Sequence, residues 1–429
     1  MHYSLYESMH TALKRILIKK EYSTYVIKQI LKQNKKWGSK DRYFFAKFIY
    51  SSIRHLRRLA ISVEMDWNDV QFFESLDDEK IDKLLVSWFV IIDEGLIKES
   101  VEFQKVSWHF VLKQKEQALT FSKKKEYKKI IEIWKNINVR KEIYSISDTL
   151  DEVAYKELGE KWNSILSELD KEASVYLRVN TSKISLDNLI EKLKEEGVLV
   201  KKEITPLQTE CLSLFKRQNV FLTPSFKEGL FEVQDIHSQC VAAFLDVKPG
   251  QYIVDACAGA GGKSLHIANL LNFKGKVLAL DIVEKKLKEL RRRAIRAGVS
   301  DIIETRAITN KTIKRLHSRA DVVLLDVPCS GLGVLKRHPE SKWRFNKDDL
   351  DNLHKEQSFI LSNYSKIVKP KGQLVYATCS ILPSENQLIV DTFLAQENKN
   401  TIVWKKNKEC ILEPKKGDGF FICKLEKLN

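Results

Sequence analysis

Between residues 3 and 143 the sequence has no proline and only two glycines, so the residues that most often interrupt helices are nearly missing there. Apolar residues recur in this part at spacings of three and four, as in Leu13, Ile16 and Leu17. Such spacing places them on one face of a helix. We therefore expect residues 1–143 to form an all-α domain.

The sequence also lacks any Cys-x-x-Cys pair, although it contains seven cysteines. With an odd number of cysteines in a chain of 429 residues, neither a zinc site nor a set of disulfides is predicted. We expect no bound metal. Each cysteine is then either a small buried apolar residue, which is the usual case, or a reactive thiol.

The first 20 residues contain no continuous apolar run, so we predict neither a signal peptide nor a membrane-spanning helix there. We expect a cytoplasmic protein without a membrane partner. Lysine and arginine number 73 against 57 acidic residues, a formal net charge of +16. This excess favours a polyanionic partner such as nucleic acid, but a general preference for lysine would give the same composition.

The length of the chain exceeds what one hydrophobic core usually organises, so several domains are expected. Lysines are dense between residues 114 and 141, where a helix is predicted to connect the first domain to the rest. Beyond it, a strand at 175–179, a helix at 186–196 and a strand at 198–200 predict a small α+β subdomain. We assign connecting helices and this subdomain to residues 144–233.

Strands and helices alternate in the last part of the chain, which we assign to a domain of residues 234–429. The predicted strands are 252–256, 276–281, 322–326 and 373–377, and the predicted helices are 263–271 and 284–298. This alternation is typical of a doubly wound, mainly parallel sheet. The expected fold is therefore multidomain, with an α/β Rossmann-like domain at its end.

A glycine-rich loop follows the first of these strands and opens a helix. It reads Cys257-Ala258-Gly259-Ala260-Gly261-Gly262-Lys263. A phosphate-binding Walker A loop would need glycine in place of Cys257, and a dinucleotide fingerprint would need its third glycine in place of Ser264. S-adenosylmethionine has no phosphates, and Asp281, at the end of the second strand, is placed to accept from its ribose hydroxyls. A glycine turn with an unrelated aspartate remains the alternative.

Two cysteines follow predicted strand ends, in Asp326-Val327-Pro328-Cys329 and in Thr378-Cys379-Ser380. Parallel α/β sheets place their sites at this edge. Carbon 5 of cytosine is a poor nucleophile until a thiolate adds to carbon 6, and a base must later remove the proton from carbon 5. Two cysteines can divide this work, while Asp326 hydrogen-bonds the cytosine ring.

These motifs resemble those of the Sun-type RNA (cytosine-5) methyltransferases. The resemblance implies that Cys379 attacks the base, that Cys329 assists product release, and that Asp326 contacts both substrate and cofactor. It also places S-adenosyl-L-methionine on Cys257, Ala258, Gly259, Ala260, Gly261, Gly262, Lys263, Asp281 and Asp326. The implied partner is RNA, in particular small-subunit ribosomal RNA, bound by a monomer.

The first domain resembles the helical RNA-binding domain named after the antitermination factor NusB, especially over residues 39–59. Ser39 is predicted to cap the helix there, with Asp41 in its first turn. The basic residues of this segment either contact RNA phosphates or form a solvated face. They are Lys40, Arg42, Lys47, Arg54, Arg57 and Arg58.

Three shorter segments also resemble the family: 177–181, 234–239, and 337–340 with Trp343. Each has ordinary packing as its alternative. Two departures from the family pattern are Ala260, where proline is usual, and residues 305–308, which offer no acid for the adenine.

Two other functions remain open. A DNA cytosine-5 methyltransferase would carry Glu-Asn-Val, whereas this chain has Glu385-Asn386-Gln387. A non-catalytic RNA-binding factor for ribosome assembly that retains the fold would share every motif above.

Overall fold

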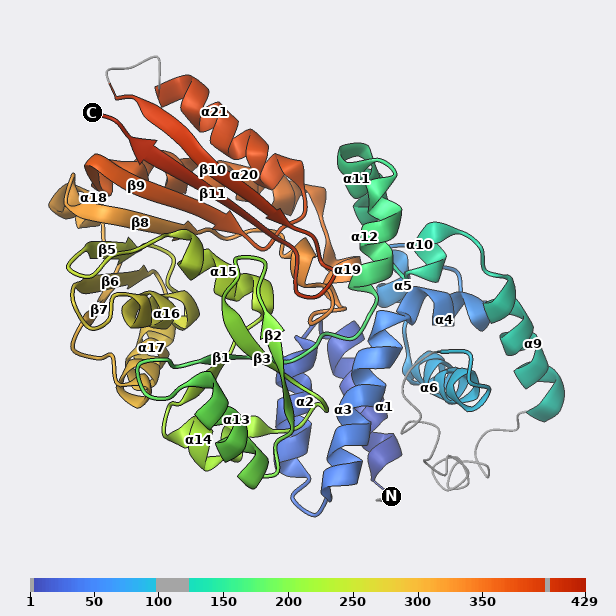
Figure 1. The fold of residues 1–429 in the computed structure, drawn as a ribbon. Coiled ribbons are helices and arrows are strands. Elements are labelled where there is room, and N and C mark those ends of the chain that lie inside the picture. The colour runs from blue at the N-terminus through green and yellow to red at the C-terminus, as the bar shows by residue number, and fades with distance from the viewer. Residues whose placement is uncertain (1–3, 98–122, 398–401) are drawn as a thin grey trace. The chain divides into compact units, whose positions relative to one another are not determined.

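A computed structural model describes residues 4–97, 123–397 and 402–429 (Figure 1). The chain divides into two compact units. Unit 1 comprises Met1–Asp170 and Arg337–Asn346, and unit 2 comprises Lys171–Lys336 and Lys347–Asn429. The predicted boundaries at residues 143 and 233 stay a prediction. Part of the lysine-dense segment 114–141 lies outside the described residues.

Unit 1 consists of helices, as the sequence predicted for this part of the chain. They are α1 (Leu5–Leu17), α2 (Ser23–Gln33), α3 (Ser39–Arg54), α4 (Leu56–Ser62), α5 (Gln71–Glu74), α6 (Asp78–Asp93), α9 (Lys123–Asn136), α10 (Arg140–Ile143), α11 (Asp148–Leu158), α12 (Lys161–Leu169) and α19 (Ser341–Arg344). The likeness of this unit to NusB remains a prediction.

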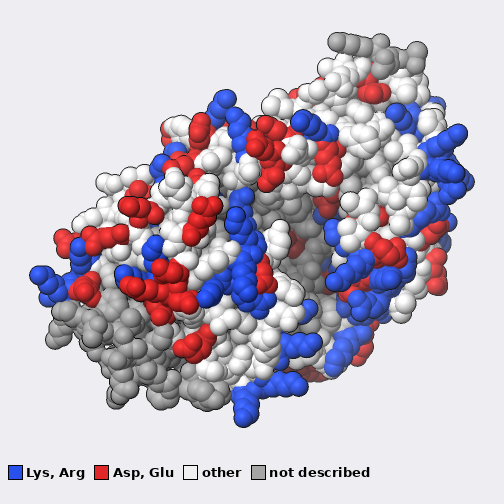
Figure 2. Space-filling view, turned by 180° about the vertical axis from the view of Figure 1, so that it is seen from behind, with Lys and Arg blue, Asp and Glu red and all other residues white. Residues whose placement is uncertain are grey.

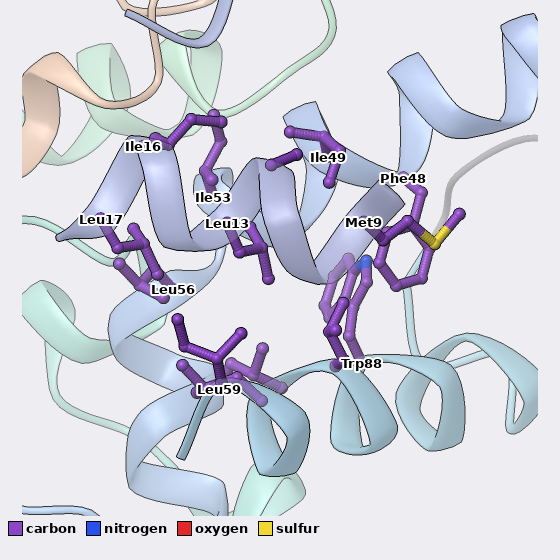
Figure 3. Packing of buried hydrophobic residues seen from close by; sticks show 14 of the residues in the cluster. Met9, Leu13, Ile16, Leu17, Phe48, Ile49, Ile53, Leu56, Leu59 and Trp88 are labelled. Atoms are coloured by element: carbon purple, nitrogen blue, oxygen red, sulfur yellow. The ribbon is translucent and has the colours of Figure 1, made fainter. Parts of the chain in front are cut away.

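The core of unit 1 forms where α1, α3, α4 and α6 turn their apolar faces toward one another (Figure 3). Ile16 of α1 lies beside Ile53 of α3, Met9 of α1 lies beside Phe48 of α3, and Trp88 of α6 lies below Met9 and Phe48. Because each helix buries one stripe at three- and four-residue spacing, packing rather than intrinsic propensity stabilises these helices.

The predicted cap of α3 is displaced by one residue. Gly38 is the N-cap, and Ser39 is already the first helical residue. Asp41 Oδ2 accepts a hydrogen bond from the Gly38 amide at 3.3 Å. An acidic side chain in the first turn of the helix therefore provides the hydrogen-bond partner for the backbone amide of the N-cap residue.

Unit 2 contains two sheets. A four-stranded antiparallel sheet has the order β2-β3-β1-β4, with β1 (Tyr176–Val179), β2 (Val200–Ile204), β3 (Glu210–Leu214) and β4 (Phe231–Val233). Its helices are α13 (Leu186–Glu195) and α14 (Pro224–Lys227). The strand predicted at 198–200 was misplaced: it begins at Val200, because Val198 is buried in the turn after α13.

The second sheet has seven strands in the order β10-β11-β9-β8-β5-β6-β7, of which β5 to β9 are parallel and β10 and β11 antiparallel. They are β5 (Tyr252–Asp255), β6 (Lys276–Asp281), β7 (Ile303–Ala307), β8 (Ala320–Asp326), β9 (Val368–Thr378), β10 (Trp404–Leu412) and β11 (Phe420–Lys427). The predicted Rossmann-like, mainly parallel sheet is confirmed.

Helices cover both faces of this sheet (Figure 1). One face packs on α15 (Ile236–Phe244), α16 (Gly262–Leu270) and α17 (Glu284–Ala297), and the other on α18 (Thr312–Leu316), α20 (Lys347–Tyr364) and α21 (Gln387–Glu397). The chain runs outward from β5 through β6 to β7, then returns to β8 on the other side of β5. The switch of direction between β5 and β8 is where such sheets bind ligands.

Candidate active site

The glycine-rich loop joins β5 to α16 at the switch point. Gly261 has φ of +88°, and a Cβ there would lie 2.4 Å from Leu290 Cγ, so only glycine fits without strain. Ala258 donates its amide to the Leu280 carbonyl at 2.9 Å, and the Ala260 carbonyl accepts from Arg293 Nη1 at 2.7 Å. Backbone hydrogen bonds therefore hold the loop on both sides despite the missing proline.

The side chain of Cys257, the first residue of this loop, is partly buried against the apolar cluster beneath α20. Burial raises the pKa of its thiol above the ordinary value. The side chain of Cys257 therefore packs partly against this cluster. The contact of Cys257 with a cofactor stays a prediction. Gly262 begins α16 directly after the turn.

Asp281 closes β6 beside the glycine-rich loop, as its position in the sequence suggested. Its Oδ2 accepts the amide of Gly259 at 2.9 Å, and its Oδ1 accepts the amide of Val283 at 2.7 Å. Each carboxylate oxygen can accept more than one hydrogen bond. The carboxylate is therefore fixed in orientation and retains capacity for ligand hydroxyls.

The carboxyl group of Asp255 is also buried next to this loop, and the sequence analysis did not single it out. Asp255, the last residue of β5, is 1% exposed and accepts a hydrogen bond from Ser264 Oγ at 2.6 Å. Burial raises the pKa of Asp255 to about 7. The bond links the end of β5 to the first turn of α16.

Lys263 forms an ion pair with Asp326 across the switch point, with 2.5 Å between Nζ and Oδ2. Burial opposes the charge of Lys263, but the Asp326 carboxylate outweighs it and raises the lysine pKa above its ordinary value. The side chains are 14% and 26% exposed. The ammonium group of Lys263 therefore already has an ion-pair partner in Asp326. The predicted contact of Lys263 with the cofactor would be made by this paired lysine.

Cys329 and Cys379 meet in the loops after β8 and β9. The two strands are neighbours, with Asp326 opposite Ala377 in the register, and the Sγ atoms lie 3.4 Å apart. The hydrogen bond with Cys379, together with burial, raises the pKa of Cys329 well above its ordinary value. The structure thus brings together the two cysteines that the sequence predicted at neighbouring strand ends.

Both cysteine loops rest on buried polar residues that the sequence analysis missed. Glu385, in the short helix η4 (Pro383–Glu385) after β9, accepts hydrogen bonds from the residue that follows each cysteine. Among the described residues, no group of three or more His, Cys, Asp or Glu side chains is placed to hold a metal ion.

Comparison with known proteins agrees with this geometry. Residues 242–426 match the model of the family described as 16S rRNA methyltransferase RsmB/F, and residues 150–220 match its ferredoxin-like domain. The chain belongs to the RsmB/F methyltransferase family. The family match thus includes the glycine-rich loop, both cysteine motifs and Glu385.

Individual relatives agree with the family match. The chain is 31% identical over 277 residues to ribosomal RNA small subunit methyltransferase B of Photorhabdus laumondii, an alignment that spans 63% of this chain and 64% of that protein. It therefore spans just under two thirds of the relative's own length. In fold it resembles PH0851, with a TM-score of 0.75, 22% identity and 98% of each chain covered.

A methyltransferase homolog from Pyrococcus horikoshii is similar to a smaller part of this chain, with a TM-score of 0.57 and 27% identity over 66% of this chain and 95% of that one.

No helix among residues 4–97, 123–397 and 402–429 is long and apolar enough to cross a membrane.

The segments at 177–181 and 234–239, which resemble the RsmB/F family, serve as supports within unit 2. Asn180 Nδ2 donates to the carbonyls of Gly229 and Ala297, so it ties β1 to the end of α17. Asp235 caps α15 by accepting the amides of His237 and Ser238.

The third such segment, residues 337–346, belongs to unit 1 although it follows the Pro-Cys loop in sequence. Glu340 accepts hydrogen bonds from the amide and hydroxyl of Ser23, and the ring of Trp343 stacks on Phe73 at 5.3 Å. The alternative of ordinary packing holds for these two residues.

The basic segment of residues 40–58, for which RNA contact and a solvated face were the two alternatives, is largely internal to unit 1. Arg54 and Arg57 are each 4% exposed, and Arg57 Nη1 donates to the Ile146 carbonyl and to Asp148. Arg58 lies over the Trp134 ring at 4.2 Å, and Arg42 donates to three carbonyls that follow α2 or end it. These four arginines therefore bind the protein itself.

Proposed function

We propose that this chain is an RNA methyltransferase that moves a methyl group from S-adenosyl-L-methionine to carbon 5 of a cytosine, in small-subunit ribosomal RNA. The contact of Cys329 with Cys379, 3.4 Å between sulfurs at two adjacent strand ends, carries the proposal. Membership of the RsmB/F family supports it, as does the name of the relative from Photorhabdus laumondii.

The loop after β5 fits the methyl donor. Gly261, whose backbone leaves no room for a side chain, lets the main chain approach a ligand, and Asp281 keeps acceptor capacity for ribose hydroxyls. S-adenosyl-L-methionine bound there would supply an electrophilic methyl group. The proposed contacts run from Cys257 to Lys263 through the backbone, with Asp281 and Asp326 as side-chain partners.

Cys379 is proposed to start the reaction by adding its thiolate to carbon 6 of the cytosine, which makes carbon 5 nucleophilic. Asp326, which contacts Lys263, can accept a hydrogen bond from the protonated cytosine ring. The new bond at carbon 6 neutralises the sulfur of Cys379, and carbon 5 could then accept the methyl group of bound S-adenosyl-L-methionine, which would leave as S-adenosylhomocysteine.

Cys329 is proposed to complete the reaction. The Cys329 and Cys379 sulfurs lie 3.4 Å apart in hydrogen-bond contact, and this contact raises the Cys329 pKa. Once Cys379 is bonded to carbon 6, its sulfur can carry no charge that opposes the ionisation of Cys329, so Cys329 releases its proton to water more readily. The Cys329 thiolate then takes the proton from carbon 5, the double bond reforms, and Cys379 leaves as a thiolate.

The test uses the full chain, small-subunit ribosomal RNA and tritiated S-adenosyl-L-methionine. Cys379→Ala should abolish tritium transfer, and Cys329→Ala should accumulate a protein–RNA adduct that survives denaturing electrophoresis. Cys410→Ala, a partly buried cysteine of β10, serves as the control and should do neither. An adduct with Cys379→Ala but not with Cys329→Ala would reverse the roles.

The assembly-factor alternative predicts RNA binding without any tritium transfer by the unaltered chain. If transfer occurs, bisulfite sequencing of ribosomal RNA from cells with and without the gene identifies the modified cytosine.

A further inference from the structure

Glu385 lies between the two cysteine loops and is fully buried, with an exposure of 0%. Its Oε1 accepts the amide of Ser330 at 2.8 Å, and its Oε2 accepts the hydroxyl of Ser330 at 2.5 Å. The hydroxyl of Ser380 donates to the same Oε2. One carboxylate therefore holds the residue directly after Cys329 and the residue directly after Cys379.

Gln357 extends this arrangement to α20. Its Nε2 donates to Glu385 Oε1 at 3.0 Å and to the Pro328 carbonyl at 2.9 Å, so the residue before Cys329 is held as well. Gln357 is also fully buried, with an exposure of 0%. Cys329 is thus fixed through the backbone on both of its sides.

The loop of Cys379 is fixed in the same way by Asn386. Thr378 Oγ1 donates to Asn386 Oδ1 at 2.5 Å, and Asn386 Nδ2 donates to the Ser380 carbonyl at 3.2 Å. The Tyr376 hydroxyl donates to the Glu385 carbonyl at 2.8 Å, which anchors the turn itself to β9.

A buried carboxylate is costly unless hydrogen bonds surround it, and bonds to a charged acceptor are stronger than neutral ones. Here the donors come from two loops that are separate in sequence, and they converge on one side chain. The same two loops carry Cys329 and Cys379, whose sulfurs lie 3.4 Å apart.

We propose that Glu385 is a positioning residue that keeps the Cys329 and Cys379 sulfurs in contact by tying their loops to one carboxylate. Its effect on methyl transfer rests on the proposed function, whereas its effect on the distance between the sulfurs does not. Glu385 holds Ser330 and Ser380, the residues that follow the two cysteines, by hydrogen bonds. Its negative charge also contributes to the raised pKa of Cys329.

The first test measures the sulfur contact by chemistry that needs no substrate. The azo oxidant diamide takes two electrons and two protons from two nearby thiols, giving a disulfide and a hydrazine. The unaltered chain should form the Cys329–Cys379 disulfide, identified by mass spectrometry of the linked peptides. Glu385→Ala should form it at least tenfold more slowly, and Glu385→Gln at close to the normal rate, because the amide oxygen still accepts and serine hydroxyls can also accept.

Glu196→Ala is the matched control. Glu196 Oε1 accepts the amide and the hydroxyl of Ser225 at 3.0 and 2.7 Å, as Glu385 does for Ser330, but it lies after α13 in the small subdomain. The disulfide should form in this variant at the normal rate. A normal rate in folded Glu385→Ala overturns the proposal, as does an equal loss in Glu196→Ala.

If Glu385→Ala does not fold, the double variant Ser330→Ala with Ser380→Ala removes the hydroxyl donors and leaves the carboxylate in place. Slower disulfide formation supports the proposal, and an unchanged rate overturns it.

The second test uses steady-state methyl transfer. Glu385→Ala should lower kcat at least tenfold with KM for RNA unchanged, and Glu385→Gln should restore most of it. Loss through KM alone would contradict a positioning role. If the unaltered chain transfers no methyl group, the proposed function fails while the diamide result still decides the role of Glu385.

Discussion

Asp255 is a buried acid whose ionisation should weaken the fold. Its pKa is about 7 in the folded chain against 3.8 for an unburied aspartate, so the folded state holds the proton more tightly. The resulting stability is fully present below pH 3.8 and is lost as the pH rises through about 7. At about 1.36 kcal/mol per pKa unit, the loss is about 4 kcal/mol at most.

Asp255→Asn should therefore gain stability relative to the unaltered chain between pH 5 and 8. The amide cannot ionise, and its oxygen can still accept from Ser264. Thermal unfolding at four pH values in this range measures the difference. Asp301→Asn, at an exposed position, should show a constant offset instead. A difference for Asp255→Asn that does not change with pH would contradict the raised pKa.

At the scale of single residues, the sequence allowed the meeting of Cys329 and Cys379 to be predicted, because each follows a strand and the two strands end at the same edge of the sheet. Glu385 was considered only as a poor match to a DNA methyltransferase motif. Its partners Ser330 and Gln357 come from another loop and from α20, and no local pattern relates residues that meet only after folding. Asp255 was missed for a similar reason, since its burial depends on both neighbouring strands.

Among the elements, α3 and α4 show what periodicity can and cannot predict. The apolar stripe of α3 was evident from its spacing, and it forms part of the core of unit 1. The burial of Arg54 and Arg57 was not evident from residue spacing, because it depends on where α11 and α12 pack. Basic and acidic side chains are intermixed on the face in Figure 2, so charge there does not outline a single basic surface.

Arg57→Ala should lower stability by roughly 2–4 kcal/mol, because Asp148 and the Ile146 carbonyl lose a buried donor. The slope of log K for RNA binding against log salt should stay unchanged, since Arg57 reaches no phosphate. Thermal unfolding and salt-dependent binding measure the two effects.

Lys40→Ala, at an exposed position of α3, should change stability by less than about 0.5 kcal/mol. Arg57→Ala would contradict the internal role if it left the unfolding midpoint unchanged and reduced the salt slope by about one unit.

The seven-stranded sheet of unit 2 was predicted at β5, β6, β8 and β9, and it was missed at β7 and at its antiparallel edge. Strands such as β6 are continuous apolar runs between turns, which the sequence shows directly. In β10, by contrast, five charged or polar residues and Cys410 separate Trp404 from Ile411, because this edge strand is largely exposed. An exposed edge strand carries little hydrophobic signal.

For the whole molecule, the assignment of residues 337–346 to unit 1 was beyond any reading of the sequence. Lys342 is 1% exposed, and its Nζ donates to Asp170 Oδ1 at 2.7 Å and to the carbonyls of Tyr144 and Arg54. Burial lowers the pKa of Lys342. Removing one member of a buried ion pair typically costs 3–5 kcal/mol, which predicts a large effect from a short segment.

Lys342→Ala should therefore lose hydrogen-exchange protection in α3 and α12, whose ends carry the Lys342 partners, while β5 to β9 keep theirs. Mass spectrometry of exchanged peptides resolves the two units. Lys347→Ala, at the exposed first residue of α20, should leave both patterns unchanged. An equal loss of protection across both units would show that they unfold as one.

Residues 337–346 also determine when unit 1 can complete its folding during synthesis on the ribosome. Its first 170 residues emerge early, but Ser23 and Asp170 gain Glu340 and Lys342 only after the intervening stretch has been translated. At about 5–20 residues per second, that delay is roughly 10–30 s. During this interval the nascent chain exposes the apolar site of Trp343, so its synthesis is the period in which chaperones matter most.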